Sequence, residues 1–314
     1  MKQVEYKIKL SKKELDNISK TYLLGSLKKH VFFKQGNINS NYYMETSKGK
    51  YVLRIYNFKT KKEIQGELDL LLYLRKKKFP SPRPVGNITT FKNKFVMVFE
   101  YIEGTNTVNV NVNLIGKLGA LTGKLHKLTT NYEFINKREG EGLKVIKKYL
   151  KREKSIILKS KFKDSKTFLE FVDKELNKIK LDNKLPKGLA HADIKDENLL
   201  LKNKKITGLI DFDNSYIDTF VVDIGSCLMW WCIDNNKLNE KKAKVFLKEY
   251  NKVRKLSSAE KNQMIEALKF NLLKQAFKYA YICLPRLKFG EAKAYYFVKV
   301  YKNLLKTEQS LKLF

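Results

Sequence analysis

The chain has 314 residues, 43% of them hydrophobic, and a formal net charge of +33 at pH 7. This length allows two lobes and a substantial buried core. No uncharged run approaches the roughly 20 apolar residues that span a bilayer. Charges are scattered through the N-terminal residues, so we expect neither a signal peptide nor membrane insertion.

The cysteines indicate the redox environment of the protein, and the lysines bear on whether it binds nucleic acid. Cys227, Cys232 and Cys283 are odd in number, lack zinc-like spacing and lie in apolar, helical surroundings. We interpret them as buried thiols of a cytoplasmic, reducing environment. The lysines are dispersed along the whole chain rather than clustered with arginine and aromatic residues. This dispersal indicates a compositional bias, and we expect no nucleic-acid partner.

Residues 1–104 predict a strand-rich lobe with one main helix. Capping boxes at Ser11–Glu14 and Thr60–Glu63 predict two helix starts, and the second helix has an apolar face. Three closely spaced prolines end that helix and impose an extended segment. The strands are expected at 31–33, 41–46, 50–56 and 95–101, the apolar face at Ile64, Leu68, Leu71 and Leu72, and the prolines at 80, 82 and 84.

Residues 105–314 predict a larger and mostly helical lobe. An apolar stripe runs from Leu114 to Leu128 and includes His126, which we interpret as a structural residue. Further helices are expected at 162–179 and 292–305. A third capping box, Ser257–Glu260, predicts the start of one long helix toward Cys283.

The segment HADIKDENLLLKNKKITGLIDFD, which begins at His191, carries the chemistry. Two short apolar runs flank a polar turn at 202–205, a pattern typical of a hairpin. If the runs pair, we expect Asn198 opposite Asp211, where two oxygen ligands suit Mg²⁺ with nucleotide phosphates. Asp193 precedes the hairpin and is free to point at an incoming hydroxyl. The pattern predicts a phosphoryl-transfer site.

These residues resemble the catalytic core of the protein-kinase-like fold, in its aminoglycoside phosphotransferase and choline kinase branch. The H-x-D-x-x-x-x-N pattern falls on His191, Asp193 and Asn198. The resemblance implies that Asp193 accepts the hydroxyl proton or orients the nucleophile, that His191 braces the loop, and that Asn198 and Asp211 hold magnesium. It also implies that Asp223 steadies the loop from behind.

The first lobe extends this resemblance. Arg54 stands where the family usually has a phosphate-gripping lysine, and Glu67 matches the helix acid that pairs with it. The turn that contains Asn39 and Ser40 is expected to cover the phosphates. The segment 99–104 resembles the hinge between the lobes, whose main chain would bind adenine near Glu100 and Ile102. The implied fold is α+β and bilobal, divided into residues 1–104 and 105–314.

Within this branch the chain most resembles homoserine kinases of the aminoglycoside-phosphotransferase type. The likeness places Asp213, Trp231 and Arg286 at the acceptor, with Arg286 facing a carboxylate. Lys195 departs from that group and resembles the lysine of serine/threonine protein kinases, where it would stabilise charge on the γ-phosphate. A protein kinase is disfavoured, because no activation segment of useful length separates Asp211 from Asp223.

The sequence therefore predicts an ATP- and Mg²⁺-dependent kinase that phosphorylates the hydroxyl of a small molecule. The leading candidate for this acceptor is a homoserine-like amino alcohol. An aminoglycoside, choline, ethanolamine, hydroxylysine or a sugar remains an alternative acceptor. A second alternative is a non-catalytic, basic binding protein on the same scaffold. We expect a monomer or a homodimer.

Overall fold

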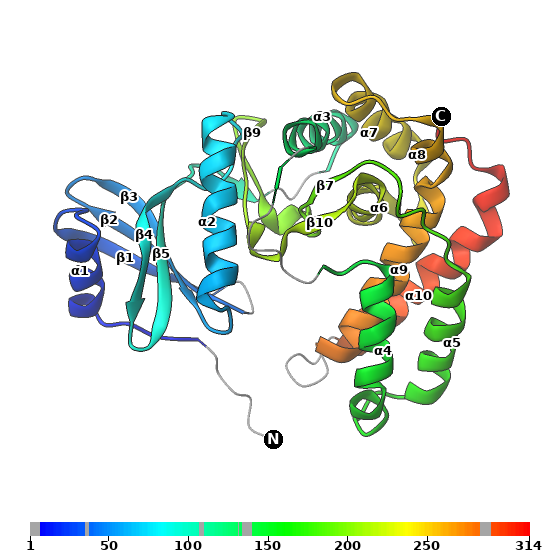
Figure 1. The fold of residues 1–314 in the computed structure, drawn as a ribbon, viewed down its shortest axis with the longest axis horizontal. Helices are drawn as coiled ribbons and strands as arrows, with labels where there is room; N and C mark the ends of the chain where they lie inside the picture. The colour runs from blue at the N-terminus through cyan, green and yellow to red at the C-terminus, as the bar shows by residue number, and fades with distance from the viewer. Residues whose placement is uncertain (1–6, 35–37, 107–109, 131, 134–139, 283–289) are drawn as a thin grey trace.

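The described residues between Lys12 and Glu100 form a five-stranded antiparallel sheet and two helices (Figure 1). The strand order is β1-β2-β3-β5-β4. This computed structural model describes residues 7–34, 38–106, 110–130, 132–133, 140–282 and 290–314. The elements are β1 Leu27–Phe33, β2 Ser40–Thr46, β3 Gly49–Tyr56, β4 Pro84–Phe91, β5 Lys94–Glu100, α1 Lys12–Thr21 and α2 Lys61–Lys76. The extended segment predicted after the prolines is strand β4.

Helix α2 stands between the sheet and the rest of the molecule (Figure 1). Both predicted capping boxes are formed, by Ser11 with Glu14 at α1 and by Thr60 with Glu63 at α2. The prediction for Leu72 is wrong, because its side chain is 40% exposed. The buried side of α2 is turned toward Leu70 and Leu74 instead.

The larger part is mostly helical, with short strand pairs that carry the loops of the site. Strand β7 pairs antiparallel with β10, and β8 pairs with both β6 and β9. The strands are β6 Thr105–Asn106, β7 Lys187–Ala190, β8 Leu199–Lys202, β9 Lys205–Leu209, β10 Tyr216–Thr219, β11 Ile233–Asp234 and β12 Lys237–Leu238. The helices are α3 Val112–Thr129, α4 Leu143–Leu158, α5 Ser165–Lys178, α6 Phe220–Trp231, α7 Glu240–Val253, α8 Ser258–Asn262, α9 Met264–Ile282 and α10 Gly290–Thr307.

The third capping box does not open one long helix, so this prediction is corrected. Ser257 and Glu260 cap the short α8, and α9 begins after a break at Gln263. The Gln263 amide donates to the Glu260 carbonyl, which closes a tight turn between the helices. Helix α4, which was not predicted, packs against α5 and α9.

Among the described residues two large buried clusters form the core, and Ala190, Ala192 and Tyr216 form a third, small one. The smaller of the two large clusters lies within the first 98 residues, whereas the larger one joins the buried face of α2 to the helices of the larger part. The division predicted between residues 104 and 105 stays a prediction. Cys227 and Cys232 are buried, and Cys283 lies outside the described residues. Among the described helices, none has the length and apolar character needed to cross a bilayer.

Candidate active site

A sharp loop follows strand β7 and carries the predicted catalytic aspartate. Ala192 has a φ of 67°, a left-handed conformation that a non-glycine residue adopts only when its surroundings hold it there. The Asp223 carboxylate provides that hold, since it accepts the amide of His191 at 3.0 Å and the amide of Ala192 at 2.8 Å. Asp223 lies in the first turn of α6, so this helix fixes the loop from behind, as predicted.

His126 completes the rear of the loop. Its Nε2 lies 3.0 Å from Asp223 Oδ2, and its Nδ1 lies 2.8 Å from the Tyr250 hydroxyl. Burial lowers the pKa of His126, and a neutral ring then donates to Asp223 and accepts from Tyr250. Burial alone would raise the pKa of Asp223, but the hydrogen bond from His126 and the amide donors lower it. His126 is structural, as predicted.

His191 braces the loop through both ring nitrogens. Nδ1 accepts the Asp193 amide at 3.3 Å, and Nε2 lies 3.1 Å from the Ile210 carbonyl. Since a carbonyl can only accept, Nε2 carries the hydrogen. Burial lowers the pKa of His191, which agrees with a neutral ring. This side chain therefore ties the loop of Asp193 to the end of β9 and does not face the cleft.

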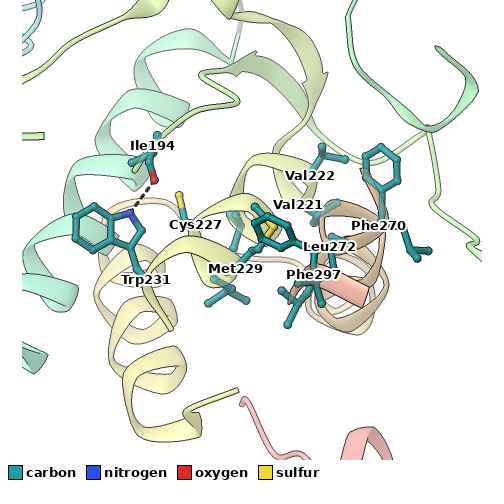
Figure 2. Packing of buried hydrophobic residues seen from close by; sticks show 14 of the residues in the cluster. Ile194, Val221, Val222, Cys227, Met229, Trp231, Phe270, Leu272 and Phe297 are labelled. Carbon is teal, nitrogen blue, oxygen red and sulfur yellow. Dashed lines mark hydrogen bonds between the residues drawn. The ribbon is translucent and has the colours of Figure 1, made fainter. Parts of the chain in front are cut away.

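Trp231 supports the same loop from the core. Its side chain is only 3% exposed, and its indole nitrogen donates to the Ile194 carbonyl at 2.7 Å (Figure 2). The predicted contact between Trp231 and the acceptor is therefore corrected, because the ring is buried and its donor is used. Trp231 is a positioning residue for the catalytic loop.

The Asp193 side chain is held at one oxygen. Asn198 Nδ2 donates to Oδ2 at 3.0 Å and to the Asp193 carbonyl at 2.8 Å, while Lys195 Nζ lies 3.2 Å from Oδ2. No described residue bonds Oδ1, which leaves that oxygen for a hydroxyl. Burial alone would lower the pKa of Lys195, but the carboxylates of Asp193 and Glu197 outweigh it and raise the pKa. Lys195 is therefore a cation in this site.

The hairpin of β8 and β9 differs from the prediction by one residue. Its turn has only two residues, Asn203 and Lys204, both with positive φ, the arrangement of a hairpin turn. A register shift between Leu200 and Leu201 adds one residue to the β9 side. The Asn198 carbonyl consequently accepts the amide of Ile210. Asp211 is the next residue, with a φ of 71°, rather than the direct partner of Asn198.

Arg54 joins the sheet to this hairpin. Its guanidinium lies 3.3 Å from Glu67 Oε1 and 3.2 Å from Asp211 Oδ1, so the predicted partner is in place. Its Nε donates to Asn41 Oδ1 at 3.2 Å. The prediction missed Asn41, although it pairs directly with Arg54 across β2 and β3. Tyr56, also missed, donates to Glu67 Oε2 at 2.8 Å.

Asp213 is held by side chains from the N-terminal part of the chain. Asn39 Nδ2 donates to its Oδ2 at 3.0 Å, and Lys59, which the prediction missed, donates to its carbonyl. Asp213 also acts electrostatically on Arg54 and Glu67. The role of Asn39 at the phosphates and the role of Asp213 at the acceptor both stay predictions.

Four predicted binding residues remain, and the structure bears on them differently. Ser40 is fully buried and accepts the Ile8 amide at 2.9 Å, so its predicted phosphate contact is corrected. The backbone amide of Glu100 donates to the Arg83 carbonyl, and the Glu100 carboxylate pairs with the side chains of Arg75 and Arg83. No described residue accepts the amide hydrogen of Ile102, which makes it the better hinge candidate. Arg286 lies outside the described residues.

The donor set fits a hard divalent cation. Asn198 and Asp211 offer an amide oxygen and a carboxylate, the oxygen ligands that Mg²⁺ takes together with phosphates and water. Burial, and after it the neighbouring Asp213, raises the pKa of Asp211 against the opposing effect of Arg54. Among the described residues no group of three His, Cys, Asp or Glu side chains forms a metal cluster, so phosphates would complete the shell.

Together the fold and the loop define a bilobal, kinase-like phosphotransferase. Residues 29–256 match the model of the phosphotransferase enzyme family, and the chain belongs to that family. It is an enzyme that transfers phosphate from ATP to the hydroxyl of a small molecule.

Individual relatives agree with this assignment. The chain is 28% identical over 233 residues to a homoserine kinase from Polaromonas naphthalenivorans. The aligned residues make up 71% of this chain and 72% of the relative. Choline kinase from Cryptosporidium parvum has the same fold, with a TM-score of 0.71 at 14% identity over 95% of this chain and 97% of the other. A spectinomycin phosphotransferase in complex with ADP and spectinomycin gives a TM-score of 0.57 at 14% identity. The match covers 95% of this chain and 98% of the other.

Proposed function

We propose that the protein phosphorylates the hydroxyl of L-homoserine or a closely similar amino alcohol, with ATP and Mg²⁺. The observation that carries this proposal is Asp193, whose Oδ1 is open while Oδ2 is held by Asn198 and Lys195. The similarity to homoserine kinases supports the choice of acceptor. A non-catalytic scaffold would have no use for this arrangement.

In the proposed reaction Asp193 orients the acceptor hydroxyl and takes its proton late in the transfer. Lys195 and Arg54 neutralise charge that develops on the phosphoryl oxygens. Asn198 and Asp211 would hold Mg²⁺, which supplies Lewis-acid stabilisation of the phosphates. Ile102 would bind adenine through its amide, and Asn39 would cover the phosphates.

An acceptor screen tests the proposal. ADP release is measured with L-homoserine, choline, ethanolamine, hydroxylysine, an aminoglycoside and a sugar at matched concentrations. We expect the highest kcat/KM with L-homoserine. Turnover of another acceptor with none for L-homoserine would refute the proposed substrate and leave the enzyme class intact.

A further inference from the structure

A pocket of about 640 Å³ lies where the end of α2, the start of β4 and the hinge segment meet. Its walls include Arg75 in the last turn of α2, Arg83 directly before β4, and Thr207 of β9. Glu100 and Ile102 of the hinge segment complete the wall on the side of the nucleotide. A pocket of this size holds a small organic ligand.

This pocket is separate from the residues of phosphate transfer. The described residues that line it include none from the catalytic loop. Arg75 lies eight residues beyond Glu67 on α2, which is about 12 Å along the helix axis. The link between α2 and β4 is fixed to β9, because the Pro80 carbonyl accepts the Leu209 amide at 2.8 Å. A ligand in this pocket would therefore not take the place of the transferred phosphate.

The pocket carries an excess of positive charge. Three cations line it, Arg75, Lys78 and Arg83, against the single carboxylate of Glu100 among its described lining residues. The Glu100 oxygens lie 3.6 Å from the Arg75 guanidinium and 3.5 Å from that of Arg83. Both distances are longer than a hydrogen bond, and no described acid forms an ion pair with Lys78. The cations of the pocket thus keep donors for a further anion.

The two arginines set this pocket apart from the general basicity of the chain. Only seven of the 65 basic residues are arginine, so a surface that is basic through composition alone would be lined by lysine. Two of the seven line this one pocket. A guanidinium presents a planar fork that binds two oxygens of one anion at once, which suits phosphate better than the point charge of a lysine does.

Ser81 adds a polar group without a partner. It lines the pocket, its side chain is 3% exposed, and its hydroxyl has no hydrogen-bond partner among the described residues. A buried polar group that stays unpaired lowers stability. A ligand oxygen at this end of the pocket would give the Ser81 hydroxyl an acceptor.

We propose that this pocket binds a small phosphate monoester. Such an ester is close to a dianion at pH 7, which matches three cations opposed by one carboxylate. Arg75 and Arg83 donate to the phosphate oxygens, and the organic part fills the remaining volume. Both arginines also pair with Glu100, so the bound phosphate competes with a residue of the hinge segment. The inference goes beyond the proposed function and does not depend on the acceptor.

Calorimetric titration of the protein saturated with ADP and Mg²⁺ tests the pocket. The probes are glycerol 3-phosphate, O-phospho-L-serine and AMP, which share a phosphate monoester and differ in the organic part, and inorganic phosphate. The salt concentration is about 0.15 M, where exposed charges are screened beyond roughly 8 Å. We expect at least one ester to bind more tightly than inorganic phosphate, and the tightest ester identifies the organic part. Binding of inorganic phosphate alone, or of no probe, would overturn the proposal.

Charge-removing variants locate the bound ester. Arg75→Gln and Arg83→Gln should each weaken its Kd by roughly 10-fold. Arg152→Gln on α4 is the matched control, because the Arg152 and Arg83 side chains are both 59% exposed, and it should leave the Kd unchanged. An equal loss in all three variants would show that the ester binds to the basic surface in general, and it would overturn the pocket.

The saturating ADP separates this pocket from the nucleotide site. An ester that binds the free protein but is excluded by ADP would lie in the nucleotide site, and the proposal would be wrong. An ester that binds in the presence of ADP and loses affinity in Arg75→Gln and Arg83→Gln confirms the pocket, whichever acceptor the enzyme phosphorylates.

Discussion

The front and the rear of the catalytic loop hold their charges in different ways. At the front, Asp193 and Lys195 keep 21% and 23% of their side chains exposed and contact one another. At the rear, Asp223 and His126 are fully buried, and each oxygen of Asp223 accepts a backbone amide. The side chains proposed to do the chemistry thus keep contacts that solvent or a ligand can replace. The side chains that fix the backbone of the loop have buried hydrogen bonds that a ligand does not reach.

The largest effect should come from the front, without loss of stability. Asp193→Asn removes the proton acceptor and should lower kcat by roughly 10²- to 10⁴-fold, while the Kd for ADP and the Tm stay close to those of the wild type. Steady-state kinetics, ADP titration and thermal melting measure these quantities. Glu197→Gln is the control, since the side chain of this acid of the same loop is 72% exposed and pairs with Lys195. Full turnover in Asp193→Asn would refute its assigned role.

The rear should behave in the opposite way. Asp223→Asn places an amide against backbone donors and should lower the free energy of unfolding by about 3 kcal/mol, as measured by urea denaturation. The folded-state pKa of Asp223 is lowered, so its contribution is present above the unfolded pKa of about 3.9 and is lost as the pH falls below it. The variant should lack this part of the acid destabilisation. Wild-type stability in Asp223→Asn would remove the contrast between front and rear.

Arg54 sharpens the comparison on the nucleotide side. Arg54→Lys keeps the charge but cannot reach Glu67, Asp211 and Asn41 together, so we expect about a 10-fold weaker Kd for ATP. Arg152→Lys, an exchange at a 59% exposed side chain of α4, should leave the Kd for ATP unchanged. Tighter ATP binding in Arg54→Lys would contradict this role. It would mean that the Arg54 guanidinium holds Asp211 away from the nucleotide instead of helping to bind it.

The smallest effect belongs to Trp231. Trp231→Phe removes one hydrogen bond to the loop, and we expect a loss of about 1 kcal/mol in stability and a fall of a few-fold in kcat. Trp230→Phe is the matched control, because the Trp230 indole nitrogen is buried and no described residue accepts a hydrogen bond from it. Equal effects in both variants would assign the loss to packing alone.

Much of the fold followed from local signals in the sequence. All three capping boxes are formed, because each depends on two side chains three residues apart. The break at Gln263 and the register of β8 with β9 were not predictable in this way. A bulge is one added residue that leaves no composition signal.

The same limit applies to the site. The spacing of His191, Asp193 and Asn198 located the catalytic loop, and the likeness to kinases located Arg54 and Glu67. Ser40 and Trp231 were misplaced, because the direction of a side chain depends on packing rather than on spacing. Asn41 was missed, although a hairpin register drawn around the two turn residues Ser47 and Lys48 would have set it opposite Arg54.

The turn at Asn203 and Lys204 shows where this chain leaves room for engineering. A left-handed conformation suits asparagine and glycine but strains a lysine. Replacing Lys204 with glycine would therefore tighten the hairpin that presents Asn198 and Asp211. Lysine is thus so frequent in this chain that it occurs even at a position whose backbone conformation disfavours it.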